Sequence, residues 1–342
     1  MDLESIAVRI YRGQHVEAVH AASVAVVDAE GRLTHSFGAP EQQVVLRSAA
    51  KPFQALPLVT SGAAGAFGFG PRELALASAS HNGSDLHAAA VAEMLARSGI
   101  APEALQCGTH LPMELRLKGA FPLRNEHRDP LRHNCSGKHA GFLALARRLD
   151  APLSEYLDPE GPGQTLVRHA LGAACELAPG ALLPAVDGCS APTYAFALTK
   201  LAVGFKNLAL GAATDPELAA ALARIRDAMQ AEPLLVSGEG RFDYDLARSF
   251  PGNVVNKGGA EAILGLGFRD PAIGIAIKVH DGGERALPPV AVAVLQQLGL
   301  IDEMTRFPLL VRHERPHVST HAGREVGEIR ADVGLQKLER SS

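Results

Sequence analysis

Residues 44–58 read VVLRSAAKPFQALPL, and the serine and lysine inside this apolar stretch bear most directly on the fold. Proline is comfortable only in the first turn of a helix, so Pro52 predicts a helix that begins near Ser48, with Ser48 at or near the N-cap. Ser48 and Lys51 would share one face of that helix. A serine becomes a nucleophile when a base lies beside it, and a buried lysine can be that base. Alone, the pair is more often a capped helix with a solvated lysine, so other motifs must decide.

Two further motifs follow in a fixed order along the chain. Ser80-x-Asn82 lies in SASHNGSD and Lys257-x-Gly259 lies in NVVNKGGAEA, and each taken alone is typical of a polar turn. Ser-x-x-Lys, Ser-x-Asn and Lys-x-Gly in this order are the signature set of the serine β-lactamases and penicillin-binding proteins. The sequence therefore resembles that fold class, which also contains the serine-dependent glutaminases. In that class the first motif opens a helix, the second joins two helices and the third lies on a strand.

Hydrophobic periodicity predicts strands near both ends of the chain and helices between them. The β-branched residues of 23–27 and the alternating isoleucines of 273–279 are typical of strands. Helical spacing recurs over 85–99, 142–149 and 216–229, and a capping aspartate precedes the last of these. We therefore predict an α/β (α+β) fold of the serine β-lactamase, penicillin-binding-protein and glutaminase type. In that fold, helices flank an antiparallel sheet and a helical insert divides the sheet-forming segments.

The predicted organisation is a single catalytic domain over residues 1–342. We expect its sheet region at about 1–47 and 235–342, and its helical region at about 48–234. Residues 107–135 fit neither the helical nor the strand period. A long polar segment of this kind inside a compact domain is typically a functional loop.

Composition excludes several classes of protein. The formal net charge is −4, so the chain lacks the basic surface typical of nucleic-acid binding. No apolar run is long enough to span a bilayer, and the N-terminal sequence MDLESIAVRIYRGQ lacks the apolar core of a signal peptide. Four cysteines in a chain of 342 residues indicate reduced thiols rather than a disulfide framework. We expect a cytoplasmic protein with no nucleic-acid or membrane partner.

The segment HNCSGKH, residues 133–139, combines several groups that bind metals. Cys135 is expected near the start of a helix, where the dipole favours the thiolate. With Cys189 and a nearby His, Asp or Lys nitrogen or oxygen, it could supply a tetrahedral zinc site. The spacing matches no standard zinc-finger pattern, and buried cysteines also act as small apolar residues, as we expect for Cys107 and Cys175. Local chemistry leaves zinc and no zinc equally open.

Longer motifs identify a specific family. The stretches RSAAKPFQALPLV, SASHNGSDLH, CGTHLP, HNCSGKHAGFLA, VDGCSAPTYA and NKGGAE resemble the L-asparaginases of the rhizobial type, also called the asparaginase II or thermolabile class. The resemblance runs from about residue 44 to about residue 284, which is most of the chain. It implies a β-lactamase-like fold, hydrolysis of L-asparagine to L-aspartate and ammonia, and a homodimer.

The resemblance also implies roles for individual residues. Ser48 and Lys51 match the nucleophile and its base, and Ser80 matches the serine of a second Ser–Lys tandem. Lys257 is the best match for the lysine of that tandem. Residues that match positions around the substrate are Arg47, His139, Asp187 and Asn82, with Arg47 expected to hold the α-carboxylate and Asp187 the α-ammonium.

The same resemblance assigns a Zn²⁺ ion to this chain. Its ligands match Cys135, Lys138 and Cys189, and lysine is an uncommon zinc ligand. The implied role of the ion is structural or substrate-positioning.

Three other functions share some of these features. A glutaminase would use the same chemistry on a longer side chain, and a β-lactamase-type amidase would use the same three motifs. The expected lack of a leader argues against the β-lactamase, because such enzymes act outside the cytoplasm. A non-catalytic zinc-dependent sensor would leave Ser48, Lys51, Ser80 and Lys257 without a role.

Overall fold

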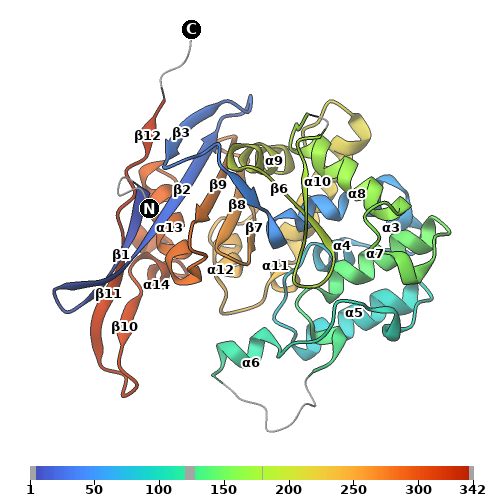
Figure 1. Ribbon diagram of the computed structural model, residues 1–342, viewed down its shortest axis with the longest axis horizontal. Coiled ribbons are helices and arrows are strands. Elements are labelled where there is room, and N and C mark those ends of the chain that lie inside the picture. The colour runs from blue at the N-terminus through green and yellow to red at the C-terminus, as the bar shows by residue number, and fades with distance from the viewer. Residues whose placement is uncertain (1–4, 120–127, 179, 339–342) are drawn as a thin grey trace.

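The computed structural model describes residues 5–119, 128–178 and 180–338 (Figure 1). A large antiparallel sheet forms one end of the molecule and most of the helices form the other, as Figure 1 shows. The sheet draws its strands from both ends of the sequence, and the chain between them supplies the helices. The expected α+β class is therefore confirmed, and so is the order of strands, helices and strands.

The large sheet has the strand order β10-β11-β1-β2-β9-β8-β7, with β3 and β12 off this path. The long strand β2 connects two parts of the sheet, because its first half pairs with β1 and its second half pairs with both β3 and β9. The strands are β1 (Ile6–Arg12), β2 (His15–Val27), β3 (Leu33–Phe37), β7 (Val254–Gly259), β8 (Ile263–Phe268), β9 (Ile273–Val279), β10 (His317–Ser319), β11 (Glu325–Ala331) and β12 (Gln336–Lys337).

Large and small side chains alternate along the central strands, and each kind faces a different layer. On one face of β8 and β9 the large apolar residues pack with α12 (Phe242–Ser249) and α13 (Leu287–Gln297). On the other face lie Gly265, Gly267 and Gly274, against helix α9 (Leu198–Leu210). A Cβ atom on Gly267 would lie 2.0 Å from the Phe205 carbonyl oxygen. The helix therefore rests directly on the backbone of the sheet.

The alternation along 273–279 predicted one buried face, and the structure confirms it for Ile275, Ile277 and Val279. The second face is buried as well, which the alternation did not predict. The residues on that face are small, so the sequence pattern alone does not mark them as buried. Their small size leaves room for the backbone of α9, which covers them.

The remaining helices pack around a second apolar core. The predicted capping of the helix at 216–229 is confirmed, because the Asp215 carboxylate accepts the backbone N–H of Glu217. The helices are α1 (Lys51–Gln54), α2 (Leu56–Thr60), α3 (Ala63–Ala66), α4 (Pro71–Ala77), α5 (Asp85–Arg97), α6 (Met113–Leu117), α7 (Ser136–Arg148), α8 (Pro162–Ala174), α10 (Pro216–Ala231), α11 (Pro233–Val236) and α14 (Val311–Glu314).

The segment expected to be purely helical also forms part of a small sheet. Strand β6 (Pro192–Ala197) lies between β4 (Gln43–Val45) and β5 (Leu183–Val186), and both pairings are antiparallel. The irregular segment 107–135 contains the short helix α6, and its residues 120–127 lie outside the described part of the chain. Over the described ranges, no helix has both the length and the apolar character that crossing a bilayer requires.

Replacing Gly267 by alanine tests the contact between α9 and the sheet. The added Cβ meets backbone rather than a movable side chain, so we expect the free energy of unfolding to fall by about 1–3 kcal/mol. Gly65→Ala is the control, because Gly65 lies on α3 with no atom near its Cβ position, and it should leave stability unchanged or slightly raised. Urea unfolding measures both variants, and equal stability of the two would contradict this packing.

Candidate active site

Ser48 lies in a tight helical turn whose first residue has an unusual backbone conformation. The 3-10 helix Arg47–Ala50 precedes α1, and Arg47 has a φ of 49°, which is uncommon for a residue other than glycine. The predicted capping role of Ser48 is wrong, because the turn already begins at Arg47 with Leu46 as its N-cap and without a side-chain capping bond. Ser48 is almost buried, at 8% exposure. Because the turn has no side-chain capping bond, the Ser48 hydroxyl does not cap this helix.

The end of strand β7 packs directly on this turn. A Cβ atom on Gly259 would lie 3.0 Å from the Leu46 carbonyl oxygen and 3.1 Å from the Ala49 nitrogen. The third motif therefore contacts the first, although about two hundred residues separate them in the sequence. Glycine at this position allows the strand and the turn to approach so closely.

Lys51 is fully buried, and its amine joins three segments of the chain. Nζ donates hydrogen bonds to the Ser80 Oγ at 2.8 Å and to the Ala79 carbonyl oxygen, and it lies 3.2 Å from the Cys135 Sγ. In the described part of the chain, the Lys51 amine makes no hydrogen bond to Ser48. The first and second motifs thus meet through Lys51 and Ser80, and the cysteine cluster lies directly beside them.

Ser80 and Asn82 lie in the connection between α4 and α5, as the second motif predicted. The backbone N–H of Ser80 donates to the Val236 carbonyl oxygen, and its own carbonyl accepts a hydrogen bond from Arg241 at 2.6 Å. The Asn82 amide donates to the Glu239 carbonyl oxygen, while its Oδ1 is buried without a hydrogen-bond partner. The connection is therefore held by the segment that precedes α12.

Lys257 lies on β7, as predicted, and its side chain is fully buried. Its Nζ lies 3.3 Å from the Asp243 carboxylate and donates to the Gly258 carbonyl oxygen at 2.6 Å. Burial lowers the pKa of Lys257 to about 8, with Asp243 opposing the shift and Lys51 and Arg241 adding to it. Both protonation states of this amine are consequently accessible near neutral pH.

Arg47 and Asp187 form an ion pair at the mouth of the site. The Arg47 Nε lies 2.6 Å from the Asp187 Oδ1, and the Lys138 Nζ lies 3.8 Å from the other carboxylate oxygen. Although burial raises it, Lys138 and Arg47 hold the pKa of Asp187 well below its usual range. The structure thus brings together two of the residues expected around the substrate, and they neutralise each other.

The two cysteines of the predicted metal cluster lie side by side. The Cys135 and Cys189 sulfurs and an Asp187 carboxylate oxygen all lie within 4.8 Å of one another, and all three residues are buried. The Lys138 Nζ lies 3.1 Å from the Cys189 Sγ. A hydrogen bond with Cys189, with Lys51 and Lys138 nearby, lowers the pKa of the Cys135 thiol well below its ordinary value against the effect of burial.

This donor set suits a metal ion. Two buried sulfurs with a nitrogen or oxygen donor are typical of a tetrahedral site for a borderline metal. Burial lowers the pKa of His139 to about 4 and an interaction with Cys189 opposes that shift, so His139 lies beside the cluster. Its Nδ1 hydrogen-bonds the Tyr156 hydroxyl at 2.7 Å. The cluster is therefore a possible metal-binding site, and it contains Asp187 in addition to the predicted cysteines.

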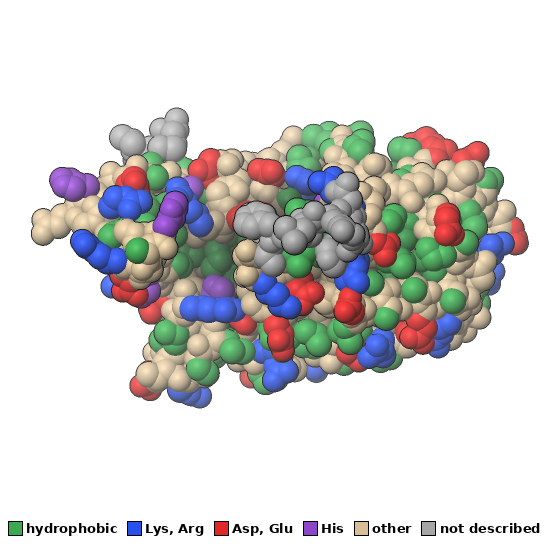
Figure 2. Space-filling model, turned by 90° about the horizontal axis from the view of Figure 1, so that it is seen from below, with side chains coloured by type: hydrophobic (Ala, Val, Ile, Leu, Met, Phe, Trp, Pro, Cys, Tyr) green, Lys and Arg blue, Asp and Glu red, His purple; other side chains and the backbone are tan. Residues whose placement is uncertain are grey.

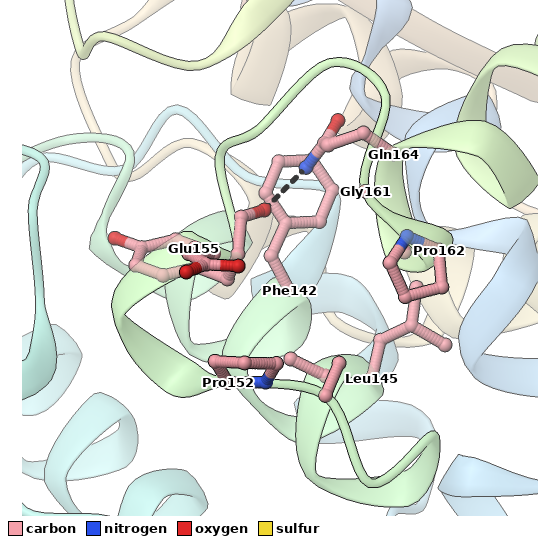
Figure 3. Close-up of a pocket in the computed structure, with 11 residues that line it drawn as sticks. Phe142, Leu145, Pro152, Glu155, Gly161, Pro162 and Gln164 are labelled. Carbon is pink, nitrogen blue, oxygen red and sulfur yellow. Dashed lines mark hydrogen bonds between the residues drawn. The ribbon is translucent and has the colours of Figure 1, made fainter.

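Cavities of very different size lie near these residues. A cavity of about 620 Å³ is open to solvent, and its walls include Arg47, Glu261 and Lys278. Figure 2 shows a face of the molecule that is hollowed between the strand-rich end and the helical end. A cavity of about 30 Å³ lies beneath α7, bounded by Phe142 and Gln164 (Figure 3), and it has room for only one or two waters.

Sequence motifs did not identify two residues of this site, Arg241 and Asp243. Arg241 and Asp243 stand in GEGRFDYD, just before the strand that carries Lys257, yet neither belongs to the three motifs. A buried lysine predicts a nearby carboxylate, and that rule could have directed attention to this acidic segment. The sequence contains 37 acidic residues, so the rule alone does not identify which one.

Comparison with known proteins agrees with the longer motifs. The family model described as L-asparaginase II matches residues 8–331, nearly the whole chain. No curated protein matches. The chain belongs to the L-asparaginase II family.

Replacing Cys135 by serine tests the metal site. We expect the variant to lose high-affinity Zn²⁺ binding, because a hydroxyl is a far weaker ligand for this ion than a thiolate. The control is Cys175→Ala, which removes a buried thiol outside the cluster. Competition of each protein with a chromophoric chelator measures Zn²⁺ affinity, and equal affinity in both variants would contradict the assignment.

Proposed function

From its membership of the L-asparaginase II family, we propose that this protein hydrolyses L-asparagine to L-aspartate and ammonia through a serine nucleophile. The observation that carries the proposal is the buried Lys51 amine, which lies against Ser80 while the Ser48 hydroxyl is not used for capping. A buried amine that bonds one serine and lies three residues after another is suited to serine activation, because it can accept one proton and pass it on.

The first chemical step is attack on the side-chain amide. Lys51 accepts the Ser48 proton while Ser48 Oγ bonds to the amide carbon, which gives a tetrahedral oxyanion. Backbone N–H groups at the start of the Ser48 turn are suited to stabilise this oxyanion. Lys51 then carries a proton that the leaving group needs.

The second step moves that proton to the departing nitrogen. The hydrogen bond between Lys51 and Ser80 gives a direct path, because Ser80 can accept a proton from Lys51 and donate its own to the leaving ammonia. Lys257 supplies a second proton, which converts the released ammonia to ammonium, and it regains a proton from the water that hydrolyses the ester; its pKa of about 8 suits this transfer near neutral pH. Water then hydrolyses the β-aspartyl ester and restores Ser48.

Recognition of the amino-acid end of asparagine falls to the Arg47–Asp187 pair. The substrate carries an α-carboxylate and an α-ammonium, so it can replace each partner of this ion pair with a group of the same sign. We assign the carboxylate to Arg47 and the ammonium to Asp187, with His139 and Asn82 near the substrate. A side chain one methylene longer would displace the amide from Ser48, which favours asparagine over glutamine.

Cys135, Lys138 and Cys189 are the residues that would hold Zn²⁺, with Asp187 beside them. When bound, the ion supplies a fixed positive charge that orders this wall of the site. Without it, Lys138 provides a cation at the same wall and holds Asp187 in the ionised form that the substrate ammonium requires.

The broader predictions of fold and organisation belong to this proposal. We propose a serine β-lactamase-like arrangement in which residues 1–342 act as one catalytic domain, since the motifs from the sheet and from the helices meet at Ser48. A homodimer and a cytoplasmic location stay predictions from the family and from the reduced cysteines.

Ser48→Ala tests the nucleophile. We expect ammonia release from asparagine to fall by roughly 10⁴-fold or more, because the covalent route is removed. Ser319→Ala, on exposed strand β10, should match the unaltered protein. Ammonia is measured with a coupled dehydrogenase assay, and turnover of nitrocefin would instead favour the β-lactamase.

One observation favours Ser80 as a rival nucleophile, namely its hydrogen bond to Lys51. Acid quenching during turnover, followed by peptide mass mapping, locates the β-aspartyl ester. We expect the added mass on the peptide that contains Ser48. An ester on Ser80 would exchange the roles of the two serines.

Arg47→Ala tests recognition of the carboxylate. Loss of a charge-assisted hydrogen bond of roughly 1.5–3 kcal/mol should raise the KM for asparagine by about 10- to 100-fold. L-Asparaginamide, in which an amide replaces the α-carboxylate, is the matched substrate, and with it the variant should lose little. Equal losses with both substrates would mean that Arg47 acts on the fold of the turn and not on the carboxylate.

A further inference from the structure

The segment 238–243, which leads into α12, contacts both members of the second Ser–Lys pair. Figure 1 shows α12 beside β7, and Asp243 lies in the first turn of this helix. The Asp243 Oδ2 accepts the backbone N–H of Gly258 at 3.0 Å and lies 3.3 Å from the Lys257 Nζ. The carboxylate is therefore fixed by the backbone of the strand that carries the lysine.

Arg241, two residues earlier, reaches the other member of the pair. Its Nη1 donates to the Ser80 carbonyl oxygen at 2.6 Å. Arg241 thus holds the backbone of Ser80, and Asp243 holds the side chain of Lys257. The same segment accepts the Asn82 amide at the Glu239 carbonyl oxygen, so it is attached to the Ser-x-Asn motif at two points.

Two glycines make this close contact possible. A Cβ atom on Gly258 would lie 2.8 Å from the Asp243 Oδ1, and one on Gly238 would lie 2.3 Å from the Asn82 Nδ2. Gly238 also has a φ of 122°, which favours glycine. A glycine on β7 therefore leaves space for the Asp243 carboxylate, and a glycine within the segment leaves space for the Asn82 side chain.

We propose that Arg241 and Asp243 are positioning residues for amide hydrolysis, with Asp243 holding the Lys257 ammonium in place and Arg241 fixing Ser80 through its carbonyl oxygen. This inference rests on the proposed function, in which Ser80 and Lys257 deliver a proton to the departing ammonia. Neither residue touches the substrate. Their effect is exerted through the orientation of the second pair and through the charge of Lys257.

The charged groups around Lys257 determine the sign of the expected effect. Asp243 faces it from α12, Lys51 faces it from α1, and Arg241 faces it from the segment before α12. Burial and the two cations lower the pKa of Lys257, and Asp243 alone among these groups raises it. Removal of the carboxylate charge should therefore cause Lys257 to lose its proton at a lower pH than the value of about 8 in the intact protein.

Asp243→Asn tests the inference, since asparagine keeps the shape and the acceptor for Gly258. In the unaltered enzyme kcat should fall above about pH 8 as the Lys257 ammonium is lost. In the variant this alkaline limb should move down by about one pH unit or more. Between pH 6 and pH 9, kcat should therefore fall by about 100-fold in the variant, against about tenfold in the unaltered enzyme. KM should change little, because Asp243 does not contact asparagine.

Asp245→Asn is the matched control on the same helix. Asp245 is also buried and also paired, but its partners are Arg312 and His313 of the C-terminal segment. This variant should keep the alkaline limb of the unaltered enzyme. A limb that moves equally in both variants, or in neither, overturns the assignment of Asp243.

Arg241→Gln and Asp243→Glu complete the test. Arg241→Gln should lower kcat at pH 6–7 with little change in KM, because it displaces Ser80, and its alkaline limb should move to higher pH because a cation near Lys257 is lost. An unchanged kcat at pH 6–7 overturns its role. If Asp243→Asn does not fold, Asp243→Glu keeps the charge and shifts its position, so kcat should fall while the alkaline limb stays in place; a moved limb overturns the inference. An unaltered protein that releases no ammonia from asparagine overturns the proposed function itself, which is distinguishable from both results.

Discussion

The fully buried amine of Lys51 is the group on which the rest of the site depends. An amine removed from water must find hydrogen-bond acceptors inside the protein, because an unpaired buried charge costs several kcal/mol. Its acceptors come from the α4–α5 connection, through Ala79 and Ser80, and from the start of α7, through Cys135. These segments consequently have to converge on α1, and the two serines and the cysteine cluster converge with them.

Charge balance extends outward from this amine. The Cys135 sulfur lies between Lys51 and the Cys189–Lys138 contact, and Lys138 in turn lies near Asp187, which pairs with Arg47. Lys257 has its own carboxylate in Asp243. Each cation thus lies near an anionic or polarisable partner, so removing one member changes the protonation of several neighbours. The site is better described as one coupled network than as two independent Ser–Lys pairs.

Much of the framework of the site could be predicted from the sequence. The three motifs predicted a helical turn, a connection between helices and a strand, and the structure places Ser48, Ser80 and Lys257 in those contexts. The partners of these residues could not be predicted. The spacing of Ser48 and Lys51 was interpreted with α-helical geometry, but Ser48 lies in a 3-10 turn and the Lys51 amine contacts Ser80 instead. Contacts between distant segments, such as Arg241 with Ser80, leave no periodic signal in the sequence.

The close packing of the sheet connects the fold to the position of Lys257. Glycines on β8 and β9 let α9 rest on the sheet backbone, so the strands beneath have little freedom to slide. β7 pairs with β8 along its whole length, and its end lies against the Ser48 turn. A shift of α9 would therefore pass through β8 to Lys257 and to the turn that carries Ser48. The packing of α9 on the sheet therefore helps to fix the position of Lys257, and of the end of β7, against the turn that carries Ser48.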